Sequence, residues 1–112
     1  MEDYNFVEID GKQHPIRFGM NALRKYGRRT GTTLADLEKI GENMDLENAL
    51  QLVFAGLEDG YRKAKQQCDL DIESLSDCID NDYDALARCM EVLTKHMGGT
   101  QKQKKGKKQS PK

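Results

Sequence analysis

Two short runs of alternating apolar and polar residues open the chain and predict a β-hairpin. The runs FVEI and KQHPIRF flank Asp10-Gly11, and Asp-Gly suits a type I′ turn, which needs positive φ at both central positions. Alternation gives each strand one apolar face, formed by Val7, Ile9, Ile16 and Phe18. Pro15 lacks a backbone N–H, so we expect the second strand to lie at a sheet edge.

From Met20 onward the apolar period lengthens from two to about 3.6 residues, which predicts four or five short helices. Their apolar stripes are Met20, Leu23 and Tyr26; Leu34, Leu37 and Ile40; Ile72, Leu75 and Ile79; and Tyr83, Leu86, Met90, Leu93 and Met97. Cap residues precede several of them, namely Thr33 paired with Asp36, Asp45, and Asp69 or Asp71. Gly27 or Gly31, then Gly41, and finally Gly98-Gly99 are expected to end helices. The predicted fold class is therefore α+β, mostly α.

The segment LENALQLVFAGLEDGYRKA, residues 46–64, is apolar on nearly every face in its middle. Such a helix is usually central in a domain or buried in an oligomer. Gly56 is expected to admit another backbone at close range.

Charge divides the chain into an acidic body and a basic tail. Residues 1–99 hold 12 basic and 19 acidic residues, a net charge of −7, whereas residues 100–112 hold six Lys and no acid. We expect a compact domain over 1–99 and a disordered Lys-rich tail over 100–112, because the tail has almost no apolar residues to bury. The acidic body argues against nucleic-acid binding over the whole surface.

Composition also indicates the setting. The start, MEDYNFVEID, lacks the basic and apolar regions of a signal peptide, and no apolar run approaches the roughly 18 residues of a membrane span. The three Cys, at 68, 78 and 89, form no CxxC pair. We therefore expect an intracellular protein with free thiols and no membrane contact.

The residue types of catalysis and metal binding are present but scattered. His14 and His96 lie far apart and belong to no triad or zinc motif. Acid pairs such as Glu58-Asp59 have the chemistry of acid–base catalysis, but they are typical of a solvated surface. We expect no catalytic residues, no metal and no cofactor, and hence no enzyme.

The order of motifs resembles a known family. IDGK…PIRFG is followed by MNALRKY, TGTTLADL and LQLVFAGLEDGY. Over about residues 6–97, this order resembles the tail assembly chaperones of long, non-contractile-tailed bacteriophages and related prophages. The resemblance implies a small helical protein of the host bacterial cytoplasm that is absent from the mature virion. It also implies two partners: the tape-measure protein, which the chaperone keeps soluble, and the tail-tube protein, whose subunits it helps recruit.

In this family a longer form often arises by ribosomal frameshifting. The Lys pairs at 104–105 and 107–108 would then mark a slippery site and a linker. The alternative is a plain basic tail.

Two groups of residues are candidates for partner binding. The helix around Leu50–Leu57 could offer a groove to an amphipathic client helix, with Phe54, Leu57 and Tyr61 as anchors. The alternative is that these three residues are the domain's own core. The basic cluster of Arg24, Arg28 and Arg29 could bind phosphate or an acidic partner, or it could be a solvated helix end.

Two further hypotheses about partners remain. Self-association is expected if many copies cover one client. The competing function is a small nucleic-acid-binding adaptor that uses the basic cluster and the Lys-rich tail, with binding that weakens steeply as salt rises.

Overall fold

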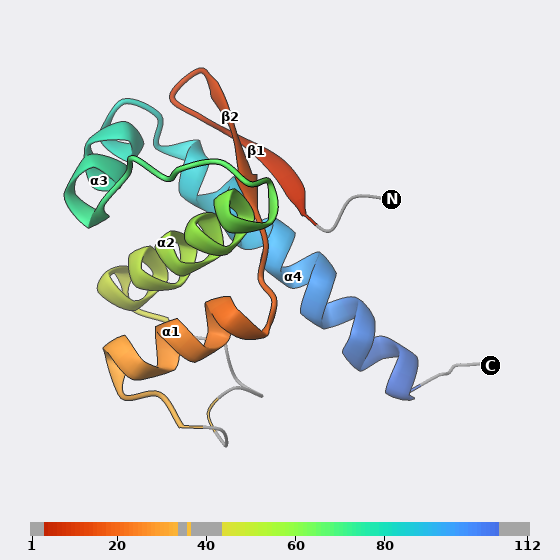
Figure 1. Ribbon diagram of the computed structural model, residues 1–112. Helices are drawn as coiled ribbons and strands as arrows, with labels where there is room; N and C mark the ends of the chain where they lie inside the picture. Colours follow the sequence, from red (N-terminus) through yellow and green to blue (C-terminus); the bar gives the residue numbers. More distant parts are fainter. Residues whose placement is uncertain (1–3, 34–35, 37–43, 106–112) are drawn as a thin grey trace.

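The computed structural model of the chain describes residues 4–33, 36 and 44–105, with side chains as far as His96. The elements in chain order are β1 (Asn5–Ile9), β2 (Lys12–Ile16), α1 (Met20–Thr30), α2 (Leu46–Lys63), α3 (Ile72–Asp80) and α4 (Asp84–Lys105) (Figure 1). A hairpin followed by helices confirms the predicted α+β, mostly α, fold class.

The helix predicted at 33–41 lies largely outside the described residues, and so does its stripe of Leu34, Leu37 and Ile40. Its predicted cap contact is present, because the Thr33 backbone N–H and hydroxyl both donate to Asp36 Oδ2, at 3.2 and 3.0 Å.

The turn of the hairpin has the predicted geometry. Asp10 and Gly11 have φ of 53° and 80°, as a type I′ turn requires. Ile9 faces Lys12 across this two-residue turn, so these two form a hydrogen-bonded pair, and such pairs alternate with non-hydrogen-bonded ones. Pro15 faces Phe6, which places it in a non-hydrogen-bonded pair where its missing N–H costs the sheet nothing.

Helices cover both outer edges of this two-stranded sheet, which protects them from further pairing. On the β1 side, Arg88 of α4 donates from Nε and Nη2 to the Glu8 carbonyl at 3.1 and 2.9 Å. Just past β2, the Arg17 N–H donates to the Gly56 carbonyl of α2 at 2.9 Å. The hairpin is therefore fixed between two helices that lie far apart in the sequence (Figure 1).

Helix α2 is the centre of the fold, as its apolar pattern predicted. Asp45 caps it by accepting from the Asn48 N–H at 2.8 Å. It packs against α1, β2, α3 and α4, and it buries residues on most of its faces, including Ala49, Leu52, Val53, Ala55 and Leu57. Among the described elements, α2 thus supplies the largest share of the buried apolar residues.

The close backbone approach on α2 occurs one turn later than predicted. A Cβ on Gly60 would lie 2.3 Å from the Pro15 carbonyl oxygen and 2.4 Å from the Ile16 nitrogen. At Gly56 the nearest group is a side chain, the Phe18 ring, at 2.6 Å from an added Cβ. Gly60 is therefore the residue that admits a neighbouring backbone, and Gly56 makes room for Phe18.

On two helices the buried face overlaps only in part with the stripe that the sequence predicted. Met20 is 73% exposed and Tyr83 82% exposed, so placing them on inner faces was wrong. Of the predicted stripes, Tyr26 and Leu93 are buried, and Leu23, Leu86 and Met90 pack against the core. Helix α1 also buries Ala22, and the start of α4 also buries Ala85 and Cys89. The observed stripes keep the helical period but extend to the neighbouring small residues Ala22, Ala85 and Cys89.

The last helix extends beyond its predicted end. Helix α4 runs through Gly98-Gly99 to Lys105, so the prediction that these glycines end it was wrong. Glycine weakens a helix by about 1 kcal/mol relative to alanine but keeps its N–H donor, unlike proline. The division into a domain over 1–99 and a tail over 100–112 stays a prediction, since residues 106–112 are outside the described part.

The first testable prediction concerns the crossing of α2 and β2. Gly60→Ala should lower the free energy of unfolding by about 1–3 kcal/mol, because the new methyl group meets rigid backbone. Gly56→Ala should cost less, because its nearest neighbour is a ring that can rotate. Urea unfolding followed by circular dichroism measures both. An equal or reversed ranking would contradict the backbone crossing at Gly60.

Candidate functional site

Two of the three predicted apolar anchors are part of the core. Leu57 is 0% exposed and Tyr61 is also buried, so neither can present a surface to a partner. The alternative interpretation, that they belong to the domain's own core, is the correct one for both. Phe54 is half-buried and packs against the edge of the same core.

Arg29 is occupied by contacts within the domain. Its Nη1 lies 2.7 Å from Glu58 Oε1, and its guanidinium carbon lies 5.3 Å from the centroid of the Phe54 ring. A cation held over an aromatic ring and paired with a carboxylate joins α1 to α2. The predicted basic cluster is therefore split, with Arg29 serving the fold.

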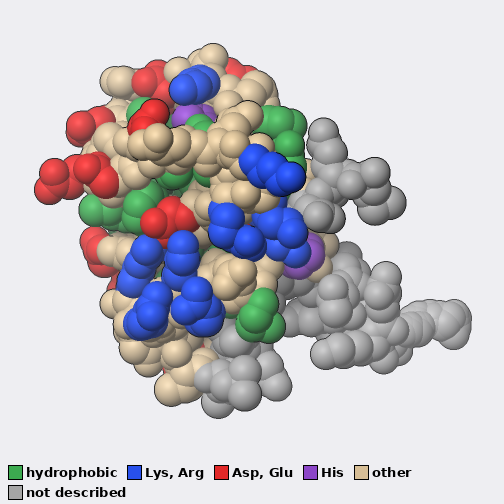
Figure 2. Space-filling model, in the orientation of Figure 1, with side chains coloured by type: hydrophobic (Ala, Val, Ile, Leu, Met, Phe, Trp, Pro, Cys, Tyr) green, Lys and Arg blue, Asp and Glu red, His purple; other side chains and the backbone are tan. Residues whose placement is uncertain are grey.

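Arg24 and Arg28 remain on the surface of α1 and flank a shallow hollow. The hollow has a volume of about 330 Å³. Its lining residues are Met20, Leu23, Arg24, Gly27, Arg28, Thr32 and Thr33. We call the first five residues the α1 surface. Space-filling Figure 2 shows Lys and Arg side chains gathered over the region of α1. Apolar and cationic side chains therefore lie side by side on this surface.

The sequence builds this surface locally. Helix α1 carries four basic residues, Arg24, Lys25, Arg28 and Arg29, and no acidic one. Gly31 ends it with φ of 78°, and its N–H bonds to the Gly27 carbonyl. Because Gly27 has no side chain, the floor of the hollow stays low between Leu23 and the following loop.

A buried carboxylate that sequence analysis treated as solvated orients α1. Asp59 is 1% exposed. Its Oδ1 accepts from Arg62 Nε and Nη2 at 3.1 and 2.7 Å, and its Oδ2 lies 3.6 Å from Arg17 Nη1. A Cβ on Gly19, which begins α1 without a side-chain cap, would lie 3.2 Å from Oδ2. The negative charge therefore sits beside the positive end of the α1 dipole.

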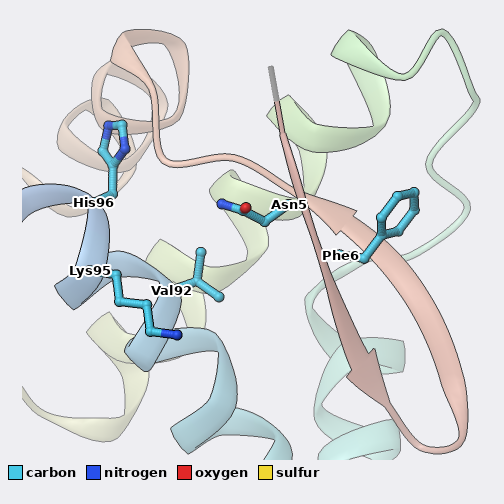
Figure 3. A pocket seen from close by; sticks show the side chains of 5 residues that line it. All are labelled: Asn5, Phe6, Val92, Lys95 and His96. Carbon is cyan, nitrogen blue, oxygen red and sulfur yellow. The ribbon is translucent and has the colours of Figure 1, made fainter. Parts of the chain in front are cut away.

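A second hollow lies between β1 and α4 (Figure 3). It has a volume of about 320 Å³ and is lined by Asn5, Phe6, Val92, Lys95 and His96. Figure 3 shows Asn5 and Phe6 on opposite sides of β1. The half-exposed Phe6 ring contacts Tyr4 edge to face, with centroids 5.5 Å apart. This mixed lining brings no group of reactive side chains together.

Burial shifts the pKa of His14 and of the three Cys in the direction that favours their neutral forms. Burial, with a smaller contribution from Lys12, lowers the pKa of His14. Burial raises the pKa of Cys89 to about 12 and also raises that of Cys68 and Cys78. Among the described residues, no group of three or more His, Cys, Asp and Glu is arranged to hold a metal ion.

His14 and Tyr61 form a buried pair that connects β2 to α2. The Tyr61 hydroxyl and His14 Nδ1 share a hydrogen bond of 2.6 Å. Burial raises the pKa of Tyr61, and Cys68 and Asp69 contribute further. Sequence analysis did not pair these residues, because they are 47 positions apart.

The second testable prediction is a pH-dependent stability caused by His14. The pKa of His14 is lower in the folded chain than its ordinary value of 6.5, so the unfolded chain binds the proton more tightly. The free energy of unfolding should therefore fall as the pH drops below about 6.5. His14→Gln should flatten this dependence in urea unfolding measured between about pH 7 and 5. An unchanged slope in that variant would contradict the role of His14.

Comparison with known proteins adds no assignment. No protein-family model matches the chain, and no curated protein and no solved structure matches it significantly. Over the described ranges, no helix has the length and apolar character needed to cross a membrane. Any functional conclusion for this chain therefore depends on its own surfaces.

Proposed function

We propose that the chain is a phage tail assembly chaperone. In this role it binds the tape-measure protein, keeps it soluble and helps recruit tail-tube subunits in the host bacterial cytoplasm. The observation that carries the proposal is the α1 surface, where a strongly exposed Met20 adjoins an apolar hollow between Arg24 and Arg28.

The chemistry of this surface suits a helical client. A long helical protein with an exposed apolar stripe aggregates unless that stripe is covered. Amphipathic helices bind by placing the stripe against an apolar groove. Methionine is flexible and polarisable, so Met20 can adapt to successive segments of a client that differ in detail.

The order of elements also supports the proposal. Three of the four motifs that resemble the chaperone family lie in the hairpin, α1 and α2, and the fourth, TGTTLADL, lies largely outside the described residues. The most apolar of them, LQLVFAGLEDGY, forms the central helix α2. Because most of its apolar residues are buried in the core, we place the client-binding surface on the neighbouring helix α1. No reactive group is needed for such a role, because covering a surface requires contact alone.

Nucleic-acid binding is the weaker candidate. Arg24 and Arg28 could contact phosphates. However, Arg29 is paired with Glu58, and residues 1–99 carry a net charge of −7. An acidic body repels a polyanion over most of its surface.

The third testable prediction uses co-expression with the tape-measure protein encoded in the same phage or prophage genome. Met20→Asp should lower the soluble yield of that client several-fold, because a carboxylate replaces the exposed apolar contact. Soluble and pelleted client are compared after lysis and centrifugation.

The matched control is Tyr83→Ser, which removes an equally exposed large side chain just before α4. This variant should keep the soluble yield of the wild type. Both variants should melt at the wild-type temperature, because neither residue is buried. Full solubility of the client with Met20→Asp would count against client binding at α1.

A further inference from the structure

We propose that the α1 surface selects an acidic amphipathic helix, one whose apolar stripe is flanked by carboxylates one helical turn apart. This inference rests on the proposed client-binding function and names the chemistry of the segment that is bound.

The apolar part of the site fits a helix. Met20, Leu23 and Gly27 follow each other at helical spacing, so they form a strip along the axis of α1. The exposed side chain of Met20 projects at one end of the strip, and Gly27, which has no side chain, leaves a hollow at the other end. A partner helix can lie along such a strip with an apolar side chain in the hollow.

The cationic part of the site sets the spacing of the partner's charges. Arg24 and Arg28 are four residues apart, so they lie one above the other on the same face of α1. Carboxylates at i and i+4 on a partner helix repeat with the same pitch. Each arginine can therefore meet one carboxylate, in the forked geometry that guanidinium groups favour.

These two arginines have no carboxylate partner among the described residues. Arg24 only approaches the Asn21 side-chain oxygen, from Nε and Nη2, at 3.4 Å. The ion pairs found in the described ranges involve Arg17, Arg29, Arg62 and Arg88 instead. Both Arg24 and Arg28 are exposed, as contact with a binding partner requires.

The charge of the rest of the molecule orients such a partner. The stretch from Asp69 to Asp84 has seven acidic residues and no basic one, whereas α1 has only basic charges. An acidic helix is repelled by the first region and attracted by the second. Charges arranged in this way fix where an acidic partner binds, and they repel a basic helix from α1.

The test is a titration of the full chain into a fluorescein-labelled helical peptide, followed by fluorescence anisotropy. The peptide carries leucines at i, i+3 and i+7 and two flanking glutamates one turn apart. The matched probe has lysine in place of both glutamates. The glutamate peptide should bind at least about tenfold more tightly than the lysine peptide, because two attractive contacts become repulsive.

Variants of the chain locate the site. Arg24→Glu with Arg28→Glu should weaken binding of the glutamate peptide and restore binding of the lysine peptide. Lys12→Glu with Lys95→Glu makes the same change of net charge at exposed positions outside α1, and it should leave the peptide preference unchanged. Circular dichroism melts establish that each variant is folded.

Three outcomes would overturn the inference. One is equal binding of both peptides, and another is glutamate-peptide binding that survives the reversal of both arginines. The third is a wild-type dimer in sedimentation that the reversal dissolves, since the site would then hold a second copy of the chain. The two proposals can be told apart. If the Arg24→Glu, Arg28→Glu variant lowers the soluble yield of the client on co-expression but the wild type binds both peptides equally, the chaperone function stands and only the acidic-helix inference falls.

Discussion

The backbone after Pro15 crosses α2 at contact distance, and the rest of the structure depends on this crossing. Gly60 admits the Pro15 carbonyl, and Gly56 admits the Phe18 ring. The Arg17 N–H bonds to the Gly56 carbonyl between them. With the two backbones this close, α2 closes the edge of β2, and Tyr61 comes within hydrogen-bond distance of His14. Leu57 then necessarily faces the interior.

The same crossing determines how α1 is held and which of its residues are left outside. The linker from Arg17 to Gly19 leads directly from the crossing into α1, beside the buried carboxylate of Asp59. At the other end of α1, Arg29 is fixed by Glu58 and Phe54. With both ends fixed and Ala22 and Tyr26 turned inward, Met20, Arg24 and Arg28 point away from α2. The candidate binding surface is thus a consequence of how the core is packed.

In this small domain, one helix forms the centre of the core and a neighbouring helix carries the candidate binding surface. A chain of this length has a limited core, and α2 supplies much of it, so α2 cannot also serve as a binding helix. Helix α1 buries only Ala22 and Tyr26 on its inner face, and its outer face carries flexible and cationic side chains. The exposed residues of α1 can therefore vary without loss of the fold.

The sequence by itself determined the features that depend on neighbouring residues. Asp10-Gly11 specified the turn, Asp45 specified the start of α2, and the continuous apolar run of α2 specified its central position. For α3 the sequence offered Asp69 or Asp71 as the cap, and the structure has Asp71. Each depends on local backbone geometry or on the length of an apolar run. Of the candidate site, the sequence identified Arg24 and Arg28 as basic residues of one helix. Only the tertiary structure decided that Met20 and Tyr83 are exposed while Ala22 and Ala85 are buried, because neighbouring stripes on one helix have the same period. It also decided that Leu57, Asp59 and Tyr61 are buried and that Arg29 forms an ion pair, since burial and ion pairing depend on which distant segments a side chain contacts.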